Sequence, residues 1–129
     1  VAVQIPAIGA TFDVVKSVSN LTYQAVSASR ALPGYTIWYK IKYTNTSGTA
    51  GNNVVIYDKI QTGAGYATNS MTNALAAGEW TNQVSSNTSP NQDYASANYV
   101  RKDLAAFPAS TVKWVRWKRA SSGTTANEV

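Results

Sequence analysis

Apolar and polar residues alternate along several segments of this chain. Over residues 35–43, the aromatic and β-branched residues at odd positions fall on one face of an extended strand, whereas Trp38, Lys40 and Lys42 fall on the other. This period of two is typical of a strand with one face in the core and one in water. The residue composition predicts further strands over residues 12–18, 53–60 and 110–119.

Turn-forming residues separate these strands at short intervals. Pro33-Gly34 precedes residues 35–43, and Asn45-Thr46-Ser47-Gly48 follows them, so tight turns are expected at both ends. Strands and turns that repeat in this way predict a β-sandwich. Residues 71–80 allow a short helix, and the Asn-, Ser- and Gln-rich residues 81–96 predict a long loop, or a loop with a weak edge strand.

The length fits one domain with two appendages. We expect an N-terminal extension over residues 1–10, a β-sandwich domain over residues 11–120 and a polar C-terminal tail over residues 121–129.

The composition removes most catalytic chemistry. The 129 residues contain neither cysteine nor histidine, which zinc and iron–sulfur sites and the Cys–His and Ser–His–Asp constellations require. The six acidic residues are scattered and form no calcium loop, although their spacing leaves a paired acid/base site open. We therefore expect no enzyme activity, no metal and no cofactor.

The polar residues indicate an exported protein. Charged residues make up only 13% of the chain, the formal net charge is +5, and Ser, Thr and Asn supply most of the polarity. Neutral hydroxyl and amide surfaces are common on secreted and cell-surface proteins. No apolar run approaches the roughly 20 residues of a membrane span, so we expect an extracellular chain whose leader has been removed, with Val1 as the mature N-terminus.

Three segments, in this order, resemble the immunoglobulin-like conserved repeat domain of bacterial and archaeal cell-surface proteins. The resemblance covers about residues 12–70, with a looser likeness over 111–119, and departs after Asp58, where the family usually has a Leu-Pro pair and this chain has Lys59-Ile60-Gln61. It implies an immunoglobulin-like antiparallel sandwich and an extracellular structural or adhesive role without catalytic residues. The segments are Lys16-Ser17-Val18; Pro33-Gly34-Tyr35 through Trp38-Tyr39-Lys40-Ile41 to Thr44-Asn45-Thr46-Ser47-Gly48; and Asn53-Val54-Val55-Ile56-Tyr57-Asp58.

The N-terminal extension is itself an extended apolar segment. Val1, Val3 and Ile5 alternate with other residues, and Ile8 follows before Gly9-Ala10. An unpaired apolar strand is an aggregation hazard, so residues 1–8 are expected to form either an edge strand of their own sandwich or a donor strand that completes the sheet of a neighbouring copy. The second arrangement is head-to-tail and propagates into a filament.

Basic and aromatic residues are interleaved on two predicted strands. Such a pattern suits single-stranded nucleic acid or an anionic polysaccharide, a subunit contact, or cation–π cover of Trp rings within one molecule. The candidate residues are Trp38, Lys40, Lys42, Trp114, Arg116, Trp117, Lys118 and Arg119.

Further candidate residues match patterns of covalent modification, namely N-glycosylation and an amide cross-link between side chains. Asn20, Asn45 and Asn87 match the N-glycosylation acceptor pattern. The combination of Lys16 with Asn45 or Asp58, and of Glu79 as a proton shuttle, is similar to the residue sets that form amide cross-links between Lys and Asn or Asp side chains in some surface immunoglobulin-like domains.

The sequence thus favours a structural subunit of a pilus-like extracellular filament, a homopolymer assembled head-to-tail by donor-strand complementation. The alternative is a non-polymerising cell-surface or adhesin module that binds anionic glycan or nucleic acid through the Trp/Lys/Arg residues.

Overall fold

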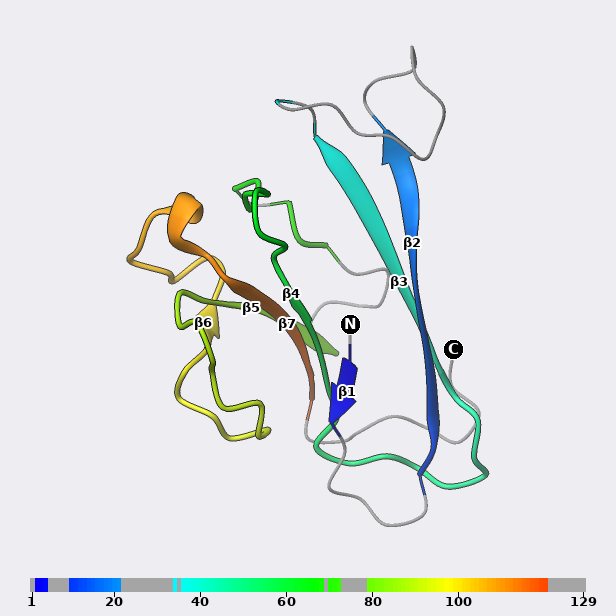
Figure 1. The fold of residues 1–129 in the computed structure, drawn as a ribbon. Coiled ribbons are helices and arrows are strands. Elements are labelled where there is room, and N and C mark those ends of the chain that lie inside the picture. The colour runs from blue at the N-terminus through cyan, green and yellow to red at the C-terminus, as the bar shows by residue number, and fades with distance from the viewer. Residues whose placement is uncertain are drawn as a thin grey trace.

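Two antiparallel β-sheets form the framework of the protein (Figure 1). The computed structural model describes residues 2–4, 10–21, 34, 36–68, 70–72 and 79–120. The described part contains no α-helix, and the predicted all-β class is confirmed. Its elements are β1 (Ala2–Gln4), β2 (Phe12–Leu21), β3 (Ile37–Asn45), β4 (Val55–Lys59), β5 (Trp80–Ser85), β6 (Val100–Arg101), the 3₁₀ segment η1 (Ala109–Thr111) and β7 (Trp114–Arg119).

The two sheets differ in size. The larger sheet has the strand order β1-β4-β7-β5-β6, and the smaller sheet consists of β2 and β3. Every strand pair is antiparallel. Since no described strand belongs to both sheets, side chains between them hold the layers together, an arrangement consistent with a β-sandwich.

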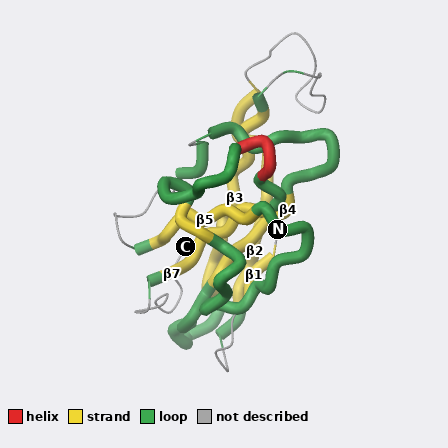
Figure 2. The backbone as a smooth tube through the Cα atoms, turned by 90° about the vertical axis from the view of Figure 1, so that its left-hand side faces the viewer, coloured by secondary structure: helices red, strands yellow, loops and turns green. Residues whose placement is uncertain are grey.

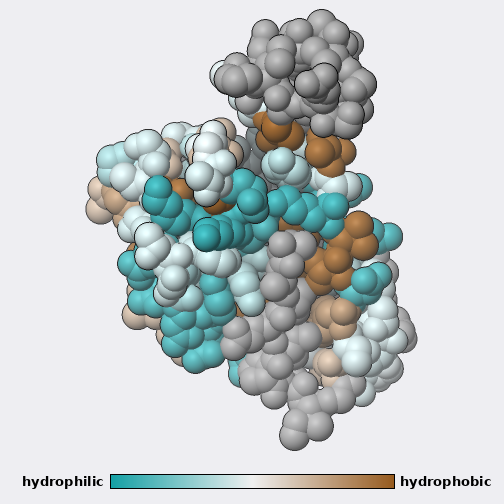
Figure 3. Space-filling model, in the orientation of Figure 1, coloured by the Kyte–Doolittle hydropathy of each residue, from teal (hydrophilic) through white to brown (hydrophobic). Residues whose placement is uncertain are grey.

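The β2–β3 ribbon buries only part of its inner face. Phe12, Val14, Ile41 and Tyr43 pack against the larger sheet, as the alternation predicts. Tyr39 lies further along the same face, yet 51% of it is exposed. The cause is that the ribbon extends past the end of the larger sheet (Figure 1), and hydrophobic surface is visible in this part of the molecule (Figure 3).

The core follows the inner face of the larger sheet in two clusters. Beneath the β2–β3 ribbon lie Val54, Ile56 and Trp80, and beside them lies a second group around Val84 and Val115. Loop residues such as Tyr66, Ala105 and Phe107 cover the second group. Trp117 packs against both clusters and so makes the core continuous. Figure 2 shows loops beside the strands in the view turned by 90°.

A loop over residues 86–99 covers the outer face of the larger sheet, the face turned away from β2 and β3. Trp114 Nε1 donates a 3.1 Å hydrogen bond to the Thr88 carbonyl oxygen. Tyr94 donates a 2.6 Å bond from its hydroxyl to the Arg119 carbonyl oxygen. These contacts place Thr88 and Tyr94 of the loop over β7.

The prediction of a loop or a weak edge strand over residues 81–96 is wrong in part. β5 occupies Trp80–Ser85 and lies inside the larger sheet, between β7 and β6. Trp80 and Val84 face the core, whereas Asn82 keeps the same parity and donates to the Met71 carbonyl oxygen. The polar residue at this inward position masked the period of two in the sequence. The predicted helix over residues 71–80 falls largely, and the predicted tail entirely, outside the described residues.

Candidate subunit interface and basic face

The first strand lies at an edge of the larger sheet. β1 pairs with β4 in the register Ala2↔Tyr57, Val3↔Ile56 and Gln4↔Val55. On its other side β4 pairs with β7 over five residue pairs. The donor-strand candidates Val1, Ile5 and Ile8 lie outside the described residues, and of Val3 only the backbone pairing is described.

The strand that receives β1 is among the most buried parts of the molecule. Val54 and Val55 have no exposed surface, and Ile56 is 3% exposed. In Figure 1 the short β1 arrow lies between β4 and the β2–β3 ribbon. The strand that occupies this edge therefore shields the side of the main core. The alternation over residues 1–8 indicates the donor candidates, but it does not indicate Val55, Ile56 and Tyr57 as their partners. The signal for those partners was the β-branched run over residues 54–56.

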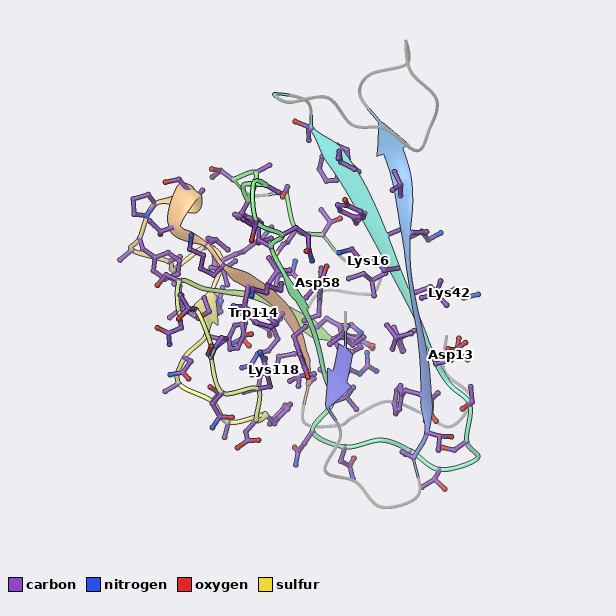
Figure 4. The ribbon with its side chains drawn as sticks, viewed as in Figure 1. Asp13, Lys16, Lys42, Asp58, Trp114 and Lys118 are labelled. Carbon is purple, nitrogen blue, oxygen red and sulfur yellow. The ribbon has the colours of Figure 1, made fainter. Side chains whose placement is uncertain are left out.

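An ion pair joins the two sheets next to this edge. Lys16 Nζ on β2 donates a hydrogen bond to Asp58 Oδ2 on β4, with side-chain exposures of 23% and 12% (Figure 4). The same ammonium group lies 4.4 Å from the centroid of the Tyr39 ring. Among the ion pairs between described residues, this is the one that links the two sheets. We call it the inter-sheet ion pair.

The structure brings together part of the suggested amide cross-link. Lys16 meets Asp58, whereas Asn45 is fully buried at the end of β3, where its side-chain amide donates to the Thr49 carbonyl oxygen of the following turn at 2.7 Å. Glu79 accepts a 2.6 Å bond from Arg119 Nη1. The amino group of Lys16 and the carboxylate of Asp58 are thus in contact, whereas Glu79, the expected proton shuttle, is paired with Arg119.

The basic residues of β7 are divided between the two faces of the sheet. Trp114, Arg116 and Lys118 alternate with Val115, Trp117 and Arg119, so the first set lies on the outer face and the second on the inner face. In Figure 4, Trp114 and Lys118 lie along the larger sheet, far from Lys42 on the smaller sheet. The eight candidate residues therefore do not form one continuous surface.

Both arginines of β7 are buried. Arg116 has no exposed surface, lies 4.1 Å from the centroid of the Tyr99 ring, and donates to Gln83 Oε1 at 2.9 Å and to the Asp93 carbonyl oxygen at 3.0 Å. Burial lowers the pKa of its guanidinium, and it raises the pKa of the Tyr99 hydroxyl. Arg119 is 5% exposed and lies 5.5 Å from the centroid of Trp80.

The lysines near β7 lie over aromatic rings of the same molecule. Lys118 Nζ is 4.2 Å from the Tyr94 centroid, and Lys59 Nζ is 5.8 Å from the Trp114 centroid. Burial is the main cause that lowers the pKa of Lys118, and the nearby Arg116 charge adds to it. Near β7 these cations therefore cover aromatic rings of their own molecule, which is the intramolecular cation–π arrangement.

The basic residues of β3 have a different setting. Lys40 and Lys42 are exposed, and Trp38 is 38% exposed. All three lie on the face of the β2–β3 ribbon that points away from the core, and Lys42 extends outward in Figure 4. This short row is the accessible part of the predicted Trp/Lys/Arg set.

The three candidate glycosylation residues also differ in setting. Asn87 is exposed in the loop after β5, whereas Asn45 is fully buried. Asn20 lies in β2, and its side chain is outside the described part. Of the two side chains that can be placed, only Asn87 presents an accessible amide.

In the described part of the chain, no three His, Cys, Asp or Glu residues gather closely enough to hold a metal ion. No helix there has the length and apolar character needed to cross a membrane. No protein-family model, curated protein or solved structure matches the chain.

Proposed function

We propose that this protein is the structural subunit of an extracellular filament with an immunoglobulin-like fold, in which the N-terminal strand of one copy pairs with β4 of the next. The observation that carries the proposal is the position of β1, an edge strand near the N-terminus that pairs with the core strand β4 through three residue pairs. The proposed mechanism is structural and needs no catalytic group or cofactor.

The exchange conserves the interactions that β1 makes. A second copy offers an identical strand, so the pairs Ala2↔Tyr57, Val3↔Ile56 and Gln4↔Val55 form equally well within one molecule or between two. Strand addition gives affinity through backbone hydrogen bonds and specificity through side chains that enter the core. The contact is heterologous, because the donor strand and the acceptor edge are different surfaces, and such contacts generate open filaments.

The competing arrangement keeps β1 in its own sheet. In the single chain β1 pairs with β4 of the same molecule, which is the geometry of a non-polymerising surface module. The two arrangements have the same register and differ only in which molecule supplies the strand. Assembly, rather than fold, therefore distinguishes them.

Deletion of residues 1–8 tests the proposal. We expect the full-length chain to form filaments visible by electron microscopy and the deleted chain to form none, because β4 then lacks a donor strand. Deletion of the tail residues 121–129 is the matched control and should leave filaments intact. A full-length chain that stays a monodisperse monomer at high concentration would refute the filament.

A further inference from the structure

Most basic side chains in the described part of the chain are engaged by their own molecule. They form ion pairs, lie over aromatic rings or donate hydrogen bonds, and these residues are Lys16, Lys59, Arg101, Lys102, Arg116, Lys118 and Arg119. Lys40, Lys42 and Lys113 have no such contact with any described residue. These three ammonium groups are exposed and available to an external anion.

Two of the three share a surface with an exposed indole ring. Trp38, Lys40 and Lys42 occupy alternate positions of β3 and so lie on the outer face of the ribbon. The Cα atoms of neighbouring members of this row, which are two residues apart in the strand, lie about 7 Å from each other. Trp38 is 38% exposed. We call these residues the β3 outer row.

The neighbouring strand leaves this surface nearly free of negative charge. Ser17 lies opposite Lys40, and Val15, which is 53% exposed, lies opposite Lys42. The described carboxylate on this face is Asp13, which pairs with Thr44 beyond the end of the row. Figure 4 shows Lys42 and Asp13 on the outward side of the ribbon.

We propose that the β3 outer row binds an acidic polysaccharide. The ammonium groups of Lys40 and Lys42 pair with sugar carboxylates, and the Trp38 ring packs against the apolar face of a sugar ring. The formal charge of +5 favours the approach of a polyanion. This surface is separate from the β1–β4 edge, so the inference goes beyond the filament and does not depend on it.

The composition of the row favours a polysaccharide over single-stranded nucleic acid. Proteins that bind single strands without sequence preference stack successive bases on several aromatic side chains. The described outer face of the ribbon offers one ring, Trp38, because Tyr39 and Tyr43 have the opposite parity and face inward. One ring with two ammonium groups suits a ligand whose binding relies chiefly on its negative charges.

Binding of the full-length chain to immobilised alginate, a polyuronate, tests the proposal. The Lys40→Gln/Lys42→Gln variant should bind about tenfold more weakly, and its slope of log affinity against log salt should fall by up to about two, one for each lost ion contact. Asp13→Asn should bind a few-fold more tightly, because it removes the carboxylate at the end of the row. Lys59→Gln/Lys113→Gln is the matched control, with the same net charge as the first variant and wild-type affinity expected.

Two results would overturn the proposal. Equal weakening of both double variants would mean that net charge, rather than the β3 outer row, sets the affinity. Tighter binding to oligo-dT than to alginate, with the same dependence on Lys40 and Lys42, would assign the row to nucleic acid. Because all five positions are exposed, unchanged unfolding midpoints are expected for each variant.

Discussion

At the scale of single residues, one buried cation has no carboxylate partner among the described residues. Arg116 is fully buried, and its charge is met by the Tyr99 ring, by Gln83 and by the Asp93 carbonyl oxygen, while Nη2 is buried without a hydrogen bond. These contacts tie β7 to β5 and to the loop over residues 86–99. Arg116 therefore acts as an anchor for the loop that covers the outer face.

Replacement of this anchor should destabilise the fold. Arg116→Ala is expected to lower the free energy of unfolding by about 2–4 kcal/mol, since it leaves a cavity and removes hydrogen bonds to a charged group. Lys118→Ala, which removes a more exposed lysine from the same face, should cost less than about 1 kcal/mol. Urea unfolding measures both values. Equal losses for the two variants would contradict the anchoring role.

At the scale of elements, the strands that the sequence predicts carry either a clear period of two or a run of β-branched residues. β3 follows the alternation directly, whereas β4 is a run of consecutive apolar residues that is buried on both faces. The split of the β7 residues between two faces follows from parity alone. For β5 the sequence predicts at most a weak edge strand, because Asn82 occupies an inward position and bonds to the Met71 carbonyl oxygen instead of packing as an apolar side chain.

Other features depend on how the two sheets are placed relative to each other. Tyr39 has the parity of a core residue and is half exposed, because the larger sheet ends before it. The sequence suggested Lys16 with either Asn45 or Asp58, and only the offset between β2 and β4 selects Asp58. The acceptor edge of β4 was missed for the same reason, since neighbours in a sheet are set by topology.

The inter-sheet ion pair leads to a prediction about covalent structure. Lys16 Nζ lies over the Tyr39 ring as well as beside Asp58, and Glu79, the expected proton shuttle, is held by Arg119 instead. We therefore expect an ion pair that remains ionic, with an intact mass equal to that of the uncross-linked sequence. A mass lower by one water would contradict this and would show an amide between Lys16 and Asp58. The Asp58→Ala variant, which has no side-chain carbonyl group at this position and so cannot form the amide, identifies any loss that arises elsewhere.

At the scale of the whole molecule, assembly depends on which copy supplies the edge strand. The structure has a five-stranded sheet whose edge is formed by a strand near the N-terminus and a smaller sheet that carries an exposed basic row on its outer side. In a filament the proposed polysaccharide row would be repeated once per subunit. Repetition raises the apparent affinity for a long polyanion without any new contact, because successive rows engage one polymer.

The most direct test of the strand exchange uses the absence of cysteine from the chain. Ala2 pairs with Tyr57, so an Ala2→Cys chain is mixed with a Tyr57→Cys chain under assembly conditions and oxidised. We predict a disulfide between the two different chains, because a donor strand from one copy lies on β4 of another. A mixture of Ala2→Cys with Ser110→Cys, at an exposed position away from β4, measures the background. A single chain that carries both Ala2→Cys and Tyr57→Cys shows whether the two positions pair within one molecule. If this double variant forms its disulfide within monomers, and the mixture of single variants cross-links no more than the background, strand exchange is contradicted.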